Sequence, residues 1–450
     1  MNHPSTLHVL VDTWVSPLTL GFFAIAYVLV LLEERLHLKK SIPVMVTAGL
    51  IWVTVAVGAH QHGVGSQVHD LFLGHLMAFA EIFCFLIAAM TFVNTMDDRG
   101  VFRWLGSGLL PANTSWKRLY WTSGTAAFIL SPILDNLTTA MVVGTLVVTL
   151  AGREKLIVSA SCISIVVAAN AGGAFSPFGD LTTLMVWQAG HVDFATTLRL
   201  LLPSMVNWLV PAAILARAIP DGEIATPDTR PRLEPGAWLV TGCFGLAIAL
   251  AVLGHQWLEL PPVAGMMFGL GILKAATTVH GMVTRDGAPP DVDDPHDVFT
   301  RVSGTVDTFR QMERAEWDTL MFFYGIILAI GGLEAIGLLE RASHALYGTL
   351  GPTWTHLAVG GISAVIDNVP VMAAVLHMAP DLSTGQWLLV TLTAGVGGSL
   401  LAVGSAAGVA LLGVAHGAYT SRDHLRATAA IALGYAASIG THLVLNRSLF

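Results

Sequence analysis

The sequence predicts an all-α polytopic membrane protein, built as an inverted repeat with two re-entrant helical hairpins and two broken transmembrane helices. Three observations predict this fold class. Of the 450 residues, 54% are hydrophobic and only 12% are charged, whereas soluble proteins carry about 25% charged residues. Apolar runs long enough to cross a bilayer recur along the whole chain. Polar motifs inside these runs occur twice, in the same order.

Composition also excludes other classes of protein. A net charge of −8 is not a basic signature, so we expect no nucleic-acid partner. Cys84, Cys162 and Cys243 lack the C-x-x-C spacing of zinc or redox sites, and a packing role is expected for them. Residues 1–15 lack a basic region and a small-residue cleavage site, so we expect no cleaved signal peptide.

Membrane spans are expected wherever about 20 apolar residues follow one another. The segments that meet this condition are 15–35, 42–59, 70–95, 157–190, 196–218, 236–255, 261–280, 312–338, 386–417 and 425–446. Two further apolar segments, 118–151 and 350–380, carry polar motifs in their middle and do not fit a simple crossing.

The distribution of Lys and Arg places these two segments as re-entrant hairpins, because basic residues concentrate on the cytoplasmic side. With the N-terminus outside, Lys117 and Lys155 both belong to the cytoplasm, so the segment between them enters and leaves on the same face. The second hairpin enters from outside and leaves Arg422 cytoplasmic. Both chain ends are then periplasmic, and the basic residues left outside are Arg199, Arg341 and Arg447.

Two motifs recur along the chain. The decapeptide AGGAFSPFGD, which ends at Asp180, aligns with VGGSLLAVGS, which ends at Ser405. The pattern S-x-x-x-D-N occurs at 131–136 and again at 363–368. A weaker alignment pairs Glu81 with Asp318.

These repeats predict two halves, residues 1–220 and 236–450, joined by a cytoplasmic linker at 221–235. In the threading above, the halves begin on opposite sides of the membrane. Inverted repeats with interrupted spans are the build of secondary transporters.

Glycine and proline predict where two spans are interrupted. The segments 170–183 and 395–408 are rich in glycine, and the first also contains Pro177. Relative to alanine, glycine costs a helix about 1 kcal/mol and proline about 3 kcal/mol. Unwound backbone at bilayer depth is tolerated where it lines a cavity or is buried in protein, so its polar groups become ligands. We therefore expect the broken spans 157–190 and 386–417 to face the two hairpin tips at one site near the midplane.

The side chains expected at this site are hard oxygen donors, and neither motif contains Lys or Arg. Such donors suit a small cation such as Na⁺ or Li⁺ and repel anions. The candidates are Asp135, Asn136, Asn170, Ser176, Asp180, Thr182, Asp367, Asn368, Ser399 and Ser405, with Glu81 and Asp318 on neighbouring spans. The direct Na⁺ ligands are expected to be Asp135, Asn136, Asp367 and Asn368.

A carboxylate shielded from water is costly when ionised and alone, so a proton and a cation compete for it. The two ions must then exchange if the protein moves between inward-facing and outward-facing states only when the carboxylate is occupied. We rank Asp135 and Asp367 first and Asp180 next, because the first two lie at symmetric tips. For Asp318, a structural hydrogen-bond role is an equal alternative. The histidines of the external loop 60–70 are expected to be solvated, with metal binding or pH sensing as the alternative.

The motifs SPILDNLTT, NAGGAFSPFGDLTT, AVIDNVPVMAAV and GVGGSLLAVGSAAGV resemble those of the NhaD-type sodium/proton antiporters of the ion transporter superfamily. The resemblance covers nearly the whole chain. It implies exchange of cytoplasmic Na⁺ or Li⁺ for external protons across a bacterial inner membrane, serving pH homeostasis and salt tolerance, often as a homodimer. Lipid and small cations are the expected partners, and no cofactor is expected.

The resemblance also implies functional roles for particular polar residues of this chain. They are Glu81, Asp135, Asn136, Asn170, Asp180, Thr182, Asp318, Asn368 and Ser405. One departure is visible in the second glycine motif, where Ala402 occupies a position at which a polar residue is expected. Ligands from that half would then come from Ser399 and Ser405.

Three alternatives remain at this point. An arsenite or other anion permease of the same superfamily fits the fold, but acidic tips without basic partners argue against it. A sodium-coupled carboxylate symporter should carry neutral tips. An enzyme or structural subunit is the third alternative, and no metalloprotease, nucleophile-elbow, phosphate-loop or haem motif supports catalysis.

Overall fold

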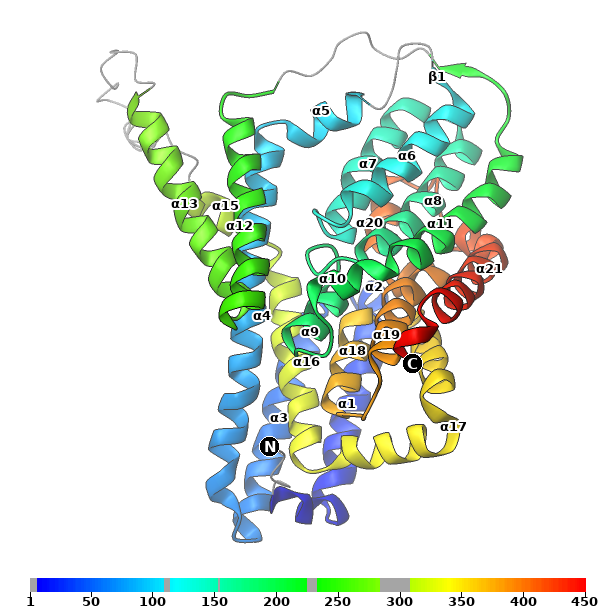
Figure 1. Cartoon of the computed structure of the whole chain (residues 1–450). Coiled ribbons are helices and arrows are strands. Elements are labelled where there is room, and N and C mark those ends of the chain that lie inside the picture. The colour runs from blue at the N-terminus through cyan, green and yellow to red at the C-terminus, as the bar shows by residue number, and fades with distance from the viewer. Residues whose placement is uncertain (1–5, 109–113, 153, 225–232, 284–307) are drawn as a thin grey trace. The chain divides into compact units, whose positions relative to one another are not determined.

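The computed structural model describes residues 6–108, 114–152, 154–224, 233–283 and 308–450. Nearly all the regular structure in these residues is helical (Figure 1), and eight helices are long and apolar enough to cross a membrane. The expectation of an all-α polytopic membrane protein is therefore confirmed. Strand pairing in the described residues is confined to β1 (Thr114–Ser115) and β2 (Glu223–Ile224), which run antiparallel.

The chain divides into two compact units. The first unit comprises Met1–Phe79, Leu109–Pro227 and Trp317–Phe450, and the second comprises Ala80–Gly108 and Asp228–Glu316. Each unit takes segments from both predicted halves, so the repeat boundaries stay a prediction. Within the predicted linker, residues 225–232 lie outside the described residues, as do residues 284–307 between the predicted spans 261–280 and 312–338.

The first unit begins with a helical pair that packs on a third helix. Its elements are η1 (Thr6–Asp12), α1 (Val15–Leu31), α2 (Glu33–Leu36), α3 (Ser41–Gln61), η2 (Gly65–Gln67) and the start of α4 (Val68–Asp98). Helix α3 packs against α1 and against α16 (Trp317–Ala335). Gly325 makes the second contact close, because a Cβ there would lie 2.6 Å from the backbone of Val44.

The segment predicted as the first hairpin forms two helices, α6 (Trp116–Leu130) and α7 (Asn136–Ala151). They contact each other, and both pack on α8 (Lys155–Gly173). Helix α8 ends at Gly173, within the glycine-rich segment 170–183, and the next helix is α9 (Leu181–Gln188). The following elements are α10 (Phe194–Thr197), η3 (Leu198–Leu200), α11 (Leu201–Leu215) and η4 (Ala216–Ala218).

The C-terminal segment of the first unit, Trp317–Phe450, also contains a helix pair followed by an interrupted span. Helix α17 (Leu338–Ser363) bends at Gly351, where φ is 73° and Pro352 follows (Figure 1). Helix α18 (Asn368–His377) completes this pair. The next span is interrupted between α19 (Thr384–Gly397) and α20 (Ala406–Val414) by η5 (Gly398–Leu400) and η6 (Ala402–Gly404). The chain ends with α21 (Ser421–Leu445) and η7 (Arg447–Leu449).

Equivalent glycines fit each helix pair against its broken span. A Cβ on Gly172 would lie 2.4 Å from the carbonyl oxygen of Phe128, and one on Gly397 would lie 2.3 Å from that of Gly360. Gly179 and Gly404 meet the tips in the same way, at the carbonyl oxygens of Ser131 and Ala364. Any larger side chain at these positions would push the helix pairs away from the breaks.

The second unit contains the rest of α4 with α5 (Val101–Gly108), α12 (Ala237–Leu258), α13 (Pro262–Val283) and α15 (Thr308–Glu313). Helices α12 and α13 pack closely, because Gly265 and Gly269 face Ala251 and Ala247 at spacings that a side chain would fill. Such stripes of small residues are typical of helix contacts in membranes. The ion pair of Arg314 with Asp98 spans 2.6 Å and raises the pKa of the guanidinium.

Candidate functional site

The interrupted segments bring four helix N-termini into the interior of the first unit. Asp135, Asp180, Asp367 and Ser405 occupy the N-cap positions of α7, α9, α18 and α20. Helices α9, α18 and α19 lie side by side (Figure 1), and α7 packs on α20. Each helix pair thus contacts the broken span of the other half. The backbone amides at such N-termini favour negative charge, which helps to keep acidic side chains there.

Asp180 is the most shielded acidic residue of this group, with 6% of its surface exposed. Its carboxylate accepts the backbone N–H of Thr182 at 3.0 Å. The amide of Asn368 donates to both carboxylate oxygens, at 3.1 and 3.2 Å. A Cβ on Gly395 would lie 2.9 Å from the same carboxylate, so α19 also closes on it. Segments from both halves therefore surround Asp180.

A second hydrogen-bonded chain links three of the predicted residues. The Asn136 amide donates to Asn170 Oδ1 at 2.9 Å, and Asn170 Nδ2 donates to the hydroxyl of Ser399 at 2.8 Å. Asn170 and Ser399 are fully buried. The tip of the first helix pair is thus connected through α8 to the break after α19.

Asp135 has a distinct local role. Its backbone has φ 62° and ψ 159°, a combination that residues other than glycine rarely adopt. Its carboxylate accepts the N–H of Thr138 at 2.7 Å and the Thr138 hydroxyl at 2.9 Å, which caps α7. The side chain is half-buried. Asp135 therefore fixes the turn at the tip, and direct ion binding by it stays a prediction.

Asp367 does not cap its helix and instead faces a basic residue. Lys40 Nζ lies 3.8 Å from Asp367 Oδ2 and 4.8 Å above the ring of Phe322. The expectation that the acidic tips lack basic partners is therefore wrong for Asp367. Lys40 immediately precedes α3, and its pairing with Asp367 depends on tertiary packing that the sequence does not show.

The remaining predicted residues fall into three groups. Thr182 is fully buried in the first turn of α9, and Ser405 caps α20 by accepting the N–H of Gly408 at 3.3 Å. Asp318 accepts a hydrogen bond from the Ser41 hydroxyl beside Lys40, which fits the structural alternative for this residue. Glu81 is half-buried on α4 within the second unit, so its part in the site stays a prediction.

Two serines of the repeated motif hold the tips in place, a role the sequence did not indicate. Ser131 donates to the carbonyl of Ala169 at 2.5 Å, and Ser363 donates to that of Ala394 at 2.7 Å. Both serines are fully buried. Ser176 adds a hydrogen bond to the carbonyl of Pro132 at 2.8 Å. The recurrence of S-x-x-x-D-N was the available signal, since the serine repeats together with the Asp-Asn pair.

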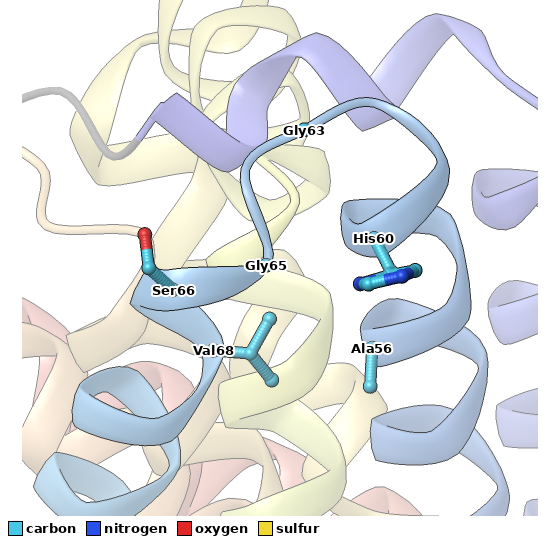
Figure 2. A pocket seen from close by; sticks show the side chains of 6 residues that line it. All are labelled: Ala56, His60, Gly63, Gly65, Ser66 and Val68. Carbon is cyan, nitrogen blue, oxygen red and sulfur yellow. The ribbon is translucent and has the colours of Figure 1, made fainter.

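The predicted histidine loop lies at the turn between α3 and α4. There, a pocket of about 500 Å³ is lined by Ala56, His60, Gly63, Gly65, Ser66 and Val68 (Figure 2). None of the predicted site residues lines it. His62 turns back to the carbonyl of Gly58 at 2.8 Å. In the described residues, no metal-binding group of three side chains includes His60, His62 or His69.

Interrupted helices that gather polar side chains within a membrane bundle define a secondary transporter. Residues 27–395 match the family model described as "Citrate transporter". The chain belongs to this family and, within it, to the NhaD-type group shown by the relatives below.

The relatives are similar over nearly the whole chain. The Na⁺/H⁺ antiporter NhaD of Alkalimonas amylolytica is 45% identical over 448 residues, which cover 98% of this chain and 93% of the relative. The Na⁺/H⁺ antiporter NhaD of Vibrio cholerae is also 45% identical, over 95% of this chain and 91% of its own. Sodium/proton antiporter 1 of Arabidopsis thaliana is 31% identical, over 95% of this chain and 72% of the relative. The resemblance stated from the motifs is confirmed, and the family is one of transporters and not of enzymes.

Proposed function

We propose that this protein is a secondary active transporter that exchanges cytoplasmic Na⁺ or Li⁺ for external H⁺. One observation carries the proposal most directly. Asp180 is a buried carboxylate that joins the two halves through Asn368. The relatives named as Na⁺/H⁺ antiporters, similar over almost the full length, support the same exchange.

The donor chemistry of the site suits a small hard cation. Asp180, Asn368 and Asn170 offer carboxylate and amide oxygens, and the buried hydroxyls of Thr182 and Ser399 add two more donors. Oxygen donors of this kind bind hard cations. A cation at Asp180 would neutralise its charge and take over the role of the Asn368 hydrogen bonds. A proton would neutralise the same charge, so the two ions exclude each other.

Competition for one carboxylate leads to exchange of the two ions if the protein cannot switch between its inward-facing and outward-facing states while the carboxylate is empty and ionised. An unneutralised carboxylate in the membrane interior is costly, so the unloaded site would be held back. With either ion bound, the charge is neutralised and the protein could switch between the two states. We expect the negative charges of Asp135 and Asp367 to contribute at the two tips, where Asp135 also sets the turn and Lys40 lies beside Asp367.

The location and assembly of the protein follow from the same proposal. We propose that it lies in a bacterial inner membrane with both chain ends periplasmic. The distribution of Lys and Arg along the sequence supports this orientation. We also propose a homodimer, as the resemblance to NhaD-type antiporters implies, with lipid and small cations as the other contacts and no cofactor.

The proposal is tested in inverted membrane vesicles with an imposed pH gradient, acid inside. Addition of NaCl or LiCl should release protons, and choline chloride at the same ionic strength should not. KCl defines the selectivity. Asp180→Asn should abolish the response, and Asp135→Asn and Asp367→Asn should weaken it strongly. Proton release by Na⁺ that is unchanged in all three variants would refute the assignment of the site.

The alternative function, transport of an anion, is tested in the same vesicles. Citrate and arsenite uptake should stay at the level of empty vesicles, because acidic side chains dominate the site. The Lys40 contact with Asp367 is a feature that would favour an anion. Accumulation of citrate or arsenite without Na⁺-driven proton release would overturn the proposed function.

A further inference from the structure

Three side chains with metal-binding atoms meet within the first unit, apart from the residues assigned above. His75 belongs to α4, Glu334 to α16 and His377 to the end of α18. One ligand atom from each side chain lies within 4.8 Å of the other two. In the described residues, this is the group of three that could hold a metal ion.

The cluster is close-packed and largely shielded from solvent. His75 Nε2 lies 3.9 Å from Glu334 Oε2, and His377 Nδ1 is hydrogen-bonded to the same oxygen. The two imidazole rings lie 5.2 Å apart between centroids. The exposed fractions of the side chains are 12% for His75, 19% for His377 and 39% for Glu334. Both rings therefore approach one carboxylate oxygen, and the Glu334 side chain that carries it is partly exposed.

The backbone is shaped to let this cluster form. Gly331 lies one turn before Glu334 on α16, and a Cβ there would lie 2.4 Å from the His75 ring. Any side chain at Gly331 would displace the imidazole. His75 also contacts Trp52, at 5.8 Å between ring centroids, and Trp52 is held by a 2.8 Å hydrogen bond to the carbonyl of Leu328. Both Gly331 and Trp52 therefore restrict the position of His75.

We propose that His75, Glu334 and His377 form a binding site for a divalent transition metal ion of the Zn²⁺ class. Two imidazoles and one carboxylate, with a fourth position for water, are a common Zn²⁺ ligand set. Na⁺ and Mg²⁺ prefer oxygen donors, so the imidazoles select against them. Metal–ligand bonds of about 2.0–2.2 Å would require the three donor atoms to move closer together.

The position of the site connects it to the exchange proposed above, and this consequence rests on the proposed function. Asn368 begins α18 and contacts Asp180, while His377 is the last residue of α18. A bound ion would fasten that end of α18 to α4 and α16. If α18 moves during exchange, the metal ion should inhibit transport without occupying the Na⁺ site.

Metal binding is tested first on the purified full-length protein with a tag that lacks histidine. Co²⁺, added as a spectroscopic probe, should give the intense visible bands of a four-coordinate site, and Zn²⁺ should displace it. His377→Gln should lower Co²⁺ affinity by at least roughly 100-fold, because even changes outside the ligands cost 10- to 100-fold. His344→Gln, a substitution of an 82% exposed side chain on α17, should leave it unchanged.

A second variant separates a folding defect from the loss of a ligand. His377→Cys should retain the metal and add a sulfur-to-Co²⁺ charge-transfer band, which only direct ligation produces. Absence of four-coordinate Co²⁺ bands in the native protein, or equal bands in native protein and His377→Gln, would overturn the proposal. The same holds if His377→Cys binds Co²⁺ without the new band.

Transport then tests the consequence for α18. Zn²⁺ should inhibit Na⁺-driven proton release by native protein and by His344→Gln, but not by His377→Gln. If native vesicles show no Na⁺-driven release, the proposed function fails, while the Co²⁺ spectrum still decides the metal site. If release occurs and Zn²⁺ binds without inhibiting it, the proposed restraint on α18 is wrong.

Discussion

Asn368 donates its amide to both carboxylate oxygens of Asp180, at 3.1 and 3.2 Å. The two residues are far apart in the sequence and begin two different helices, α18 and α9. One helix follows a hairpin tip, and the other follows the break in a membrane span. The contact therefore ties a tip of one predicted half to the interrupted span of the other.

Substitution Asn368→Ala should weaken Na⁺-driven exchange. A hydrogen bond to a charged group contributes about 1.5–3 kcal/mol, and the variant also removes an amide oxygen that a cation can use. We expect the Na⁺ concentration for half-maximal proton release to rise at least roughly tenfold, since about 1.4 kcal/mol corresponds to a factor of ten. The measurement is proton release from inverted vesicles over a range of Na⁺ concentrations.

Asn446→Ala is the matched control for this substitution. Asn446 is a buried asparagine that bonds to His442 and to the carbonyl of Arg199, at the end of α21. Its loss should reduce the amount of folded protein without changing the Na⁺ requirement. If the half-maximal Na⁺ concentration is also unchanged in Asn368→Ala, Asn368 does not take part in ion binding.

The positions of the helix breaks could be predicted because they follow from local chemistry. The glycines at 172, 173 and 179, with Pro177, disfavour a continuous helix whatever surrounds them. The structure ends α8 at Gly173 and begins α9 at Leu181. In the same way, polar residues inside apolar runs identified Asn136, Asn170 and Ser399, which the structure joins.

The pairing of charges could not be predicted, because it depends on tertiary packing. Lys40 follows the first apolar span and has no sequence relation to Asp367, yet α3 and α18 bring the two within 3.8 Å. The ranking of the acids was limited for the same reason. Symmetric positions favoured Asp135 and Asp367, whereas burial distinguishes Asp180, and which of the three carries the ion stays a prediction.

Substitution Asp135→Asn should separate the capping role of this residue from its charge. Asparagine caps helices about as well as aspartate and has nearly the same size and shape, so α7 should form normally. We expect an unfolding midpoint within about 2 °C of the native protein, because a change well under 1 kcal/mol moves it little in a chain of this size. Na⁺-driven proton release should nevertheless fall by roughly tenfold or more if the charge is used.

Asp193→Asn is the control, because Asp193 caps α10 with the same pair of contacts, to the N–H and hydroxyl of Thr196 at 2.7 and 2.8 Å. Asp193 is exposed. Both variants are compared by thermal unfolding in detergent and by proton release. Full activity in Asp135→Asn would show that Asp135 acts only as a helix cap and that its charge is not used in exchange.

Substitution Lys40→Gln should lower the Na⁺ requirement. A fixed cation near Asp367 repels a second cation, and two unit charges about 4 Å apart interact by roughly 1–4 kcal/mol at effective dielectric constants from 80 to 20. We expect the half-maximal Na⁺ concentration to fall by about fivefold or more. Lys39→Gln removes an exposed charge from the neighbouring position and should have little effect. A higher Na⁺ requirement in Lys40→Gln would show that Lys40 supports cation binding.

Substitution Gly397→Ala should destabilise the protein by separating α17 from α19. Its Cβ would lie 2.3 Å from the carbonyl oxygen of Gly360, a backbone atom that cannot rotate away. Overpacking of this kind costs about 1–3 kcal/mol. The unfolding midpoint, followed by tryptophan fluorescence in detergent, should therefore fall by several degrees.

Gly172→Ala provides the equivalent change in the other half, with its Cβ 2.4 Å from the carbonyl oxygen of Phe128. Gly413→Ala on α20 is the control, because no atom lies within 4 Å of the added methyl group. The control should be neutral or slightly stabilising, since alanine favours a helix over glycine. Similar losses in Gly397→Ala and Gly172→Ala would mean that both helix pairs depend on the same backbone contact. A loss confined to one of them would contradict the predicted equivalence of the two halves.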